Sequence, residues 1–187
     1  MIQGNHDEVI TSKNFSKKIT WFNEIAIKSL KWTRNKLLES DNCSQYEYLG
    51  SLKPQMEVKF NDHLFMISHG TPDENWGYFL FPFWKKEPEP EQKSKILSWV
   101  KKWDIVVLGH THQAFVYKTR GKVVINPGSV GQPRDGDSRA SYGVVEFSKS
   151  RIEGKIIRIK YDIKKTCEAI FREELDEYLC QRLISGV

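Results

Sequence analysis

The chain has 187 residues, of which 39% are hydrophobic and 12% aromatic, enough for the core of one globular domain. Its formal net charge is +5, but 24 acidic residues are interspersed among 29 basic ones, which disfavours a dedicated nucleic-acid-binding protein. No stretch approaches the roughly 18 apolar residues of a membrane span, and Met1–Gln3 does not resemble the start of a secretory leader. The cysteines are odd in number and lack Cys-x-x-Cys spacing, which predicts reduced thiols in a soluble cytoplasmic protein.

The first third of the chain predicts helices followed by a strand. Asn23 is a suitable N-cap, and apolar residues recur after it at three- and four-residue spacing, so we expect a helix over Asn23–Glu39. A shorter helix is expected over Ser44–Leu52, before Pro54. Met56–Phe60 alternates apolar and charged residues, which is typical of a half-buried strand.

Two apolar runs in the middle of the chain each lead into a polar loop. Leu64–Ile67 has no polar member and is followed by Ser68-His69-Gly70. Asp104–Leu108 is followed in the same way by Gly109-His110-Thr111-His112. Such runs indicate central strands that deliver polar loops at their carboxyl ends. A helix over Gln92–Trp103 is expected between them.

The last third predicts short strands and then a helical tail. Four segments alternate apolar and polar residues: Ala114–Lys118, Val123–Asn126, Tyr142–Phe147 and Ile156–Tyr161. We expect these to form an antiparallel sheet packed behind a mixed sheet. From Asp162 onward, apolar residues recur at helical spacing until Gly186, which can stop a helix. The pattern predicts one α/β domain over residues 1–187.

Most of the histidines lie in glycine-containing polar loops. The chain has 5 histidines, and four of them share this setting: His6, His69, His110 and His112. Imidazoles that follow apolar strands, with glycine beside them, can converge on one point at the edge of a sheet. Each motif alone is weak, since Gly4-Asn5-His6-Asp7 by itself is only a turn. His63, in a turn beside Asp62, is expected to be structural.

The order of these motifs resembles that of the calcineurin-like metallophosphoesterase family: Gly-Asn-His-Asp, then a histidine, then Gly-His-Thr-His. The small prokaryotic phosphodiesterase/phosphatase branch is the most similar, because Ile125–Asp137 and Arg139–Tyr142 resemble it too. The resemblance covers essentially the whole chain. It implies a two-sheet sandwich flanked by helices and a metal-dependent hydrolase of phosphomonoesters or phosphodiesters.

The resemblance also implies which residues hold metal ions. Asn5, His69 and His110 would bind one ion, and His112 would bind the other. Two cations roughly 3.5–4 Å apart clamp phosphate oxygens and lower the pKa of a bridging water, so that hydroxide is available near neutral pH. Mixed nitrogen and oxygen ligands suit Mn, Fe, Zn or Co.

Further roles follow from the same resemblance. His6 would protonate the leaving oxygen, and the adjacent Asp7 would orient or tune it. Three residues are weaker candidates for substrate binding: Gly128, Ser129 and Arg134. An equally good interpretation is a turn whose glycines take positive φ, with Arg134 paired to Asp135 or Asp137.

The family pattern places an Asp-x-His and a Gly-Asp upstream of Gly4, and neither motif lies in this sequence. The resemblance therefore implies an N-terminally truncated domain that lacks about 60 residues, or two strand–helix crossovers. We expect such a chain to keep one weak ion site and to be nearly inactive by itself. An exposed sheet edge would make it self-associate as a homo-oligomer or depend on a complementing N-terminal fragment.

Two alternative functions stay open on the sequence alone. A non-catalytic, partner-dependent remnant on the same fold is the first, although His6 argues against it because a scaffold needs no proton donor. A nuclease is the second, but no basic stripe with interleaved aromatics supports it. The aromatic run Trp76–Trp84 is compatible with stacking on a nucleobase or, more often, with packing in a cap.

Overall fold

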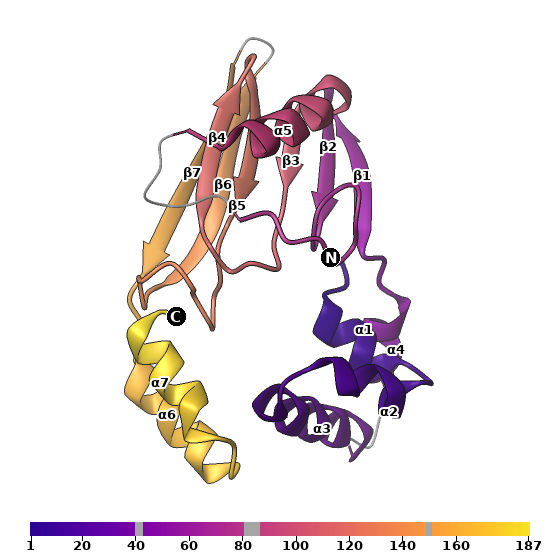
Figure 1. Cartoon of the computed structure of the whole chain (residues 1–187), viewed down its shortest axis with the longest axis vertical. Coiled ribbons are helices and arrows are strands. Elements are labelled where there is room, and N and C mark those ends of the chain that lie inside the picture. The colour runs from indigo at the N-terminus through magenta and orange to yellow at the C-terminus, as the bar shows by residue number, and fades with distance from the viewer. Residues whose placement is uncertain (40–42, 81–86, 149–150) are drawn as a thin grey trace.

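The computed structural model describes residues 1–39, 43–80, 87–148 and 151–187, and Figure 1 shows their arrangement. A five-stranded mixed sheet has the order β1-β2-β3-β5-β4. Its strands are β1 (Gln55–Phe60), β2 (His63–Ser68), β3 (Ile105–Val107), β4 (Phe115–Thr119) and β5 (Lys122–Asn126). β2, β3 and β5 run parallel, whereas β1 and β4 are antiparallel to their neighbours. The predicted α/β class with a mixed sheet is confirmed.

The main core lies between this sheet and helix α5 (Pro90–Lys102), which crosses one face of it (Figure 1). Ile96, Trp99 and Val100 recur at three- and four-residue spacing, so they form one apolar helix face. This face packs on Val106 and Val124, both fully buried, from the central strands. Burying such side chains stabilises the sheet at the point where β3 ends and the Gly109–His112 loop begins.

Among the described residues, the second sheet contains β6 (Ala140–Ser148) and β7 (Arg151–Ile159), which are antiparallel. The prediction of four strands in this layer was wrong for β4 and β5, which belong to the main sheet. β5 is buried on both faces, because β7 covers the side opposite α5. A Cβ on Gly154 of β7 would lie 3.0 Å from Val116 and 3.2 Å from Val123, so glycine permits this close approach.

An N-terminal group of helices packs around its own apolar cluster. It contains α1 (Asn5–Thr11), α2 (Phe15–Lys18), the 3₁₀ helix η1 (Ile19–Trp21), α3 (Glu24–Glu39) and α4 (Ser44–Ser51). The predicted α3 and α4 are confirmed, and Asn23 Oδ1 accepts a hydrogen bond from Ala26 N–H at the start of α3. Helix α1 was not predicted, since it begins inside the motif that the sequence analysis treated as a loop. Val9, Ile10 and Leu30 form the centre of the cluster.

The chain ends in a hairpin of two helices, α6 (Ile163–Arg172) and α7 (Glu177–Ser185), instead of one continuous helical run. The reversal includes Glu174, whose φ is 54°. Gly186, with a φ of 72°, follows α7 as predicted. The hairpin brings Cys167 and Cys180 together in a disulfide, with 5.1 Å between their Cα atoms. The prediction that all cysteines are reduced was therefore wrong for this pair, which only the chain reversal brings into contact.

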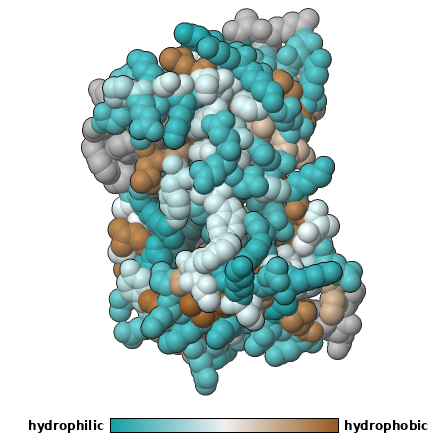
Figure 2. All heavy atoms as spheres, turned by 45° about the vertical axis from the view of Figure 1, so that its right-hand side comes forward, coloured by the Kyte–Doolittle hydropathy of each residue, from teal (hydrophilic) through white to brown (hydrophobic). Residues whose placement is uncertain are grey.

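The face of the molecule drawn in Figure 2 is mostly hydrophilic, and its hydrophobic groups are scattered among polar ones. Within the described ranges, no helix is both long and apolar enough to span a membrane.

Candidate metal centre and cavity

Three potential ligand atoms converge beyond the ends of two parallel strands. His69 follows β2, His110 follows β3, and Asn5 begins α1. His69 Nε2 lies 2.9 Å from Asn5 Oδ1 and 3.2 Å from His110 Nδ1. Adjacent ligands that are each about 2.0–2.1 Å from one ion lie roughly 3 Å apart, so these separations suit a shared transition-metal ion.

The loop that carries His110 and His112 has an unusual backbone. Both residues have positive φ, 63° and 60°, which costs free energy for residues with a Cβ. Between them, Thr111 is buried and donates its N–H to the Gly109 carbonyl at 2.7 Å. The positive φ at His110 and His112, on either side of Thr111, turns the backbone so that both histidines line one cavity.

Asn126, at the end of β5, holds this loop in place. The residue is completely buried, and its Nδ2 donates to the Gly109 carbonyl at 2.9 Å and to Thr111 Oγ1 at 3.0 Å. Its Oδ1 accepts from the Gly128 N–H at 3.0 Å. Buried polar groups that are fully paired rigidify their surroundings, so Asn126 offsets the strain at the histidines.

His112 is oriented from its other side. Its Nδ1 lies 2.7 Å from the Gln132 carbonyl, which can only accept, so Nδ1 carries the proton. The lone pair of Nε2 is therefore free to coordinate a metal ion. The loop that contains Gln132 makes a second hydrogen bond to His112, in which Arg134 N–H donates to the His112 carbonyl at 3.1 Å. A carbonyl that fixes the tautomer in this way is typical of metal-binding histidines.

His6 and Asp7 lie in the first turn of α1. Asp7 Oδ2 accepts the Gly4 N–H at 2.8 Å, which satisfies a donor at the helix start. Asp7 thus caps the helix start next to His6, and its predicted role in orienting His6 stays a prediction. The His6 ring contacts Phe22 edge-on, with 5.2 Å between centroids. Burial lowers the pKa of His6, while the charge of Asp7 opposes and that of Arg134 adds to this effect.

The histidines are held in their neutral form. The pKa values of His69 and His112 are both lowered to about 4, and burial is the largest cause for each. The pKa of His110 is also lowered, first by burial and then by the positive charge of Arg134. Neutral imidazole is the form that coordinates metal, so these groups are ready to bind at neutral pH.

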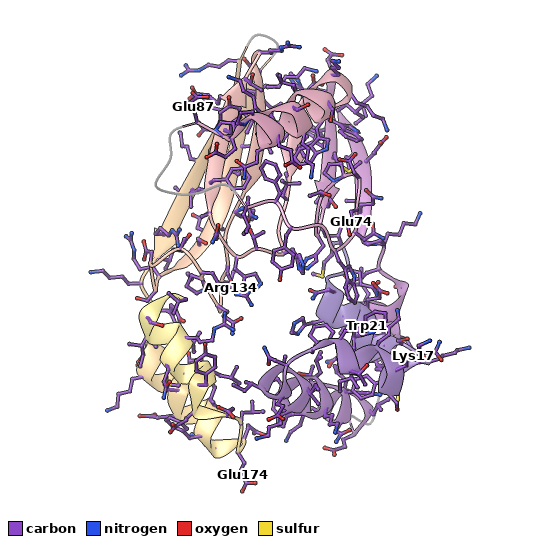
Figure 3. The ribbon with its side chains drawn as sticks, viewed as in Figure 1. Lys17, Trp21, Glu74, Glu87, Arg134 and Glu174 are labelled. Atoms are coloured by element: carbon purple, nitrogen blue, oxygen red, sulfur yellow. A yellow bond between two sulfur atoms is a disulfide. The ribbon has the colours of Figure 1, made fainter. Side chains whose placement is uncertain are left out.

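These residues form the floor of a cavity of about 770 Å³. We call Asn5, His6, His69, His110 and His112 the histidine floor. The N-terminal wall consists of the lining residues Trp21, Phe22, Asn23, Ile25, Ala26, Ser29, Trp32 and Thr33, and the C-terminal wall of Leu175, Tyr178, Leu179 and Arg182. Figure 3 shows Arg134 and Trp21 on opposite sides of this space.

The three weaker substrate-binding candidates have different positions. Arg134 lines the cavity, whereas Gly128 and Ser129 are not among its lining residues. At Gly128, whose φ is 81°, a Cβ would lie 2.4 Å from Ser141 Oγ, so the turn needs glycine there. Ser129 N–H donates to the same hydroxyl at 3.0 Å. Gly128 and Ser129 thus attach the turn to β6.

The alternative ion pairs of Arg134 do not form. Asp135 pairs with Arg158, and Asp137 pairs with Arg139 at 2.6 Å. Arg134 has instead a weak contact, 3.4 Å from its Nη2 to Gln132 Oε1.

Several residues at the site carry no local signal in the sequence. Asn126 acts through loop groups 15 and 17 positions away. The Tyr78 ring lies 4.2 Å from that of His110 and was indicated only as part of the aromatic run. Phe81–Trp84 of that run lies outside the described residues. Tyr178 and Arg182 were assigned only to a helical tail.

The donor set fits a metal ion only if Asn5 is included. Among the described residues, no group of three His, Cys, Asp or Glu side chains is arranged to hold one. His110 Nε2 is buried without a hydrogen-bond partner, and His110 Nδ1 is the ring nitrogen that lies 3.2 Å from His69 Nε2. The prediction that this chain keeps one weak ion site stays a prediction.

Comparison with known proteins identifies the family of the chain. Residues 1–150 match the model of the calcineurin-like phosphoesterase superfamily domain. The chain belongs to this superfamily of metal-dependent phosphoesterases, which confirms the family that the motifs resemble.

Similarity to individual proteins covers essentially the whole chain. The uncharacterized protein MJ0912 of Methanocaldococcus jannaschii is 31% identical over 202 residues, covering 99% of this chain and 74% of that protein. The structure of a metallophosphoesterase from Sphaerobacter thermophilus is similar, with a TM-score of 0.71, 26% identity and coverage of 100% and 76%. Hypothetical protein PH1004 from Pyrococcus horikoshii OT3 has the same fold, with a TM-score of 0.81, 22% identity and coverage of 100% and 72%.

Proposed function

We propose that this protein hydrolyses phosphomonoesters or phosphodiesters at the histidine floor with the help of bound Mn, Fe, Zn or Co. The observation that carries the proposal is the convergence of Asn5 Oδ1, His69 Nε2 and His110 Nδ1, separated by 2.9 and 3.2 Å. His112, with its Nε2 free, is the proposed ligand of a second ion. A divalent ion held by these residues would supply positive charge that polarises the phosphoryl group and activates water.

The chain itself supplies binding and proton transfer. Arg134 lines the cavity beside the histidines, and its fork of donors suits phosphoryl oxygens. A water molecule attacks phosphorus in line and releases a proton to solvent as the ester P–O bond breaks. His6, in its imidazolium form, gives a proton from Nε2 or Nδ1 to the departing oxygen and then regains a proton from solvent. Phe22 against the His6 ring, together with Asp7 at the helix start, keeps the imidazole at the floor. No covalent phospho-protein is needed.

The contrast between two leaving groups tests the role of His6. With Mn present, and in the chain complemented with the N-terminal segment that the family resemblance implies, we expect His6→Gln to lower turnover on an alkyl phosphate ester by roughly 10²–10⁴-fold. Turnover on nitrophenyl phosphate should fall much less, because nitrophenolate leaves without a proton. His63→Gln is the matched control, since His63 contacts the Ser148 carbonyl at 3.0 Å, away from the cavity lining.

Two results would count against the proposal. Equal losses on both esters, with unchanged metal content, would make His6 a positioning residue only. A lack of hydrolysis of monoesters and diesters by the complemented chain, with each of the four metals, would contradict the function itself.

A further inference from the structure

The C-terminal wall brings a second arginine to the cavity of the proposed active site. Arg182 of α7 and Arg134 of the loop after β5 both line it, although 48 positions separate them in the chain. Arg134 is also linked to the histidine floor through its N–H bond to the His112 carbonyl. The cavity therefore extends from the histidines past Arg134 to Arg182.

Neither arginine pairs with an Asp or Glu side chain within the described part of the chain. Arg134 Nε is buried without any hydrogen-bond partner. Arg182 Nε donates at 2.7 Å to a carboxylate oxygen of Val187, the last residue of the sequence, and its guanidinium lies 5.8 Å from the Tyr178 ring centroid. The nearby side-chain carboxylates are committed elsewhere, as Asp135 is to Arg158. Arg134 thus faces the cavity without a counter-ion, and Arg182 faces it with part of its guanidinium not bonded to Val187.

Their charges repel each other across this space. Burial lowers the pKa of Arg182, and the positive charge of Arg134 lowers it further. An anion between two such groups replaces repulsion with charge-assisted hydrogen bonds, which are stronger than neutral ones. A free buried donor on Arg134 adds a bond that only a ligand or water can complete.

The walls also suit an organic group. Trp32 of the N-terminal wall and Tyr178 of the C-terminal wall both line the cavity. Its volume of about 770 Å³ lies within the range of sites for small organic ligands, roughly 300–1,000 Å³. The walls meet where Trp32 Nε1 donates to Glu173 at 3.2 Å and Lys36 pairs with Glu173 at 3.0 Å. A bridged cavity favours a small molecule over a polymer.

We propose that Arg134 and Arg182 form a second anion site, which binds the phosphoryl group next to the scissile one in organic diphosphates with a flat group, such as nucleoside diphosphates. This inference rests on the proposed function for the identity of the scissile group. The anion site itself follows from the arginines and is testable without metal.

Binding to the metal-free full chain tests the site. We expect Arg182→Gln to weaken the binding of adenosine diphosphate at least about 10-fold in calorimetry, because a charge-assisted bond is lost. Arg182→Lys should give an intermediate loss, since it keeps the charge without the fork. Arg172→Gln is the matched control on the same hairpin, because Arg172 is exposed and outside the cavity lining. Adenosine, which has no phosphoryl group, should bind equally to the wild type and to Arg182→Gln.

The outcomes separate this inference from the proposed function. Unchanged diphosphate affinity in Arg182→Gln, or an equal loss in Arg172→Gln, would overturn the anion site, with circular dichroism as the check of folding. In the Mn-loaded protein, the ratio of kcat/KM for adenosine diphosphate to that for nitrophenyl phosphate should fall at least about 10-fold in Arg182→Gln. An unchanged ratio would overturn the selection of diphosphates. Arginine-dependent binding without hydrolysis of any ester would leave the anion site standing and remove the proposed function.

Discussion

The histidine floor and the two helical walls are held in place in different ways. Floor residues depend on buried bonds, such as the three made by Asn126 to Gly109, Thr111 and Gly128. The walls meet through exposed pairs, in which the Lys36 and Glu173 side chains are 51% and 38% exposed. Exposed pairs contribute little, whereas buried bonds are costly to lose. The comparison indicates that the floor is held more firmly than the contact between the walls.

The pH dependence of stability should show the largest effect at the floor. The pKa values of His69 and His112 are lowered to about 4, from 6.5 in the unfolded chain. Between pH 6.5 and 4 the unfolded chain therefore binds more protons than the folded one, so stability is full above pH 6.5 and falls as the pH drops. At about 1.4 kcal/mol per pH unit for each group, the two together lose on the order of several kcal/mol.

Urea unfolding at pH 7, 5 and 4 in the presence of a chelator measures this loss. His112→Gln removes one titrating group and should flatten the dependence. An equally steep curve for this variant would mean that His112 is not held neutral by burial.

Removing the Asn126 side chain should damage the floor and spare the walls. Asn126→Ala removes the bonds to the Gly109 carbonyl and Thr111 Oγ1 and leaves the Gly128 N–H without its partner, so we expect the free energy of unfolding to fall by roughly 2–4 kcal/mol. Mn affinity should fall with it, because the loop of His110 and His112 loses its support. Normal Mn affinity in a folded Asn126→Ala protein would contradict the assigned support.

Removing the disulfide should instead weaken the C-terminal wall and spare the histidine floor. The bond joins residues 13 apart, so replacing Cys167 and Cys180 by alanine should lower stability by at most about 3 kcal/mol. We expect Mn affinity to stay unchanged, because the pair lies in the C-terminal wall. Hydrogen exchange should become faster in α6 and α7 only, and faster exchange at the floor would show that the two regions are coupled.

Short-range patterns explain what could be predicted from the sequence. β2 and β3 were found because their apolar runs end at glycine-flanked histidines, and α5 because its apolar residues recur at helical spacing. The beginning of α1 was missed because its first turn is part of the Gly-Asn-His-Asp motif, which alone looks like a turn. Asp7 Oδ2 accepts the Gly4 N–H and thereby caps this helix. The sheet that contains β4 was misassigned because strand alternation does not indicate the pairing partner.

The remaining features depend on contacts across long separations. Trp32 and Glu173, which link the walls, lie 141 positions apart. The disulfide and the position of Arg182 depend on a reversal that includes Glu174, a residue that does not usually signal positive φ. The motifs therefore indicated the chemistry of the site, but not its walls.

Titration of Mn into the metal-free protein tests the shared ion site most directly. We expect wild-type protein to bind Mn, and His110→Ala to weaken binding by at least about 100-fold, because a direct ligand matters more than the supporting contacts that cost 10–100-fold. Asn5→Ala and His69→Ala should also weaken binding, whereas the His63→Ala control should leave it unchanged. If His110→Ala bound Mn as tightly as the wild type, the convergence of Asn5, His69 and His110 would not be a metal site.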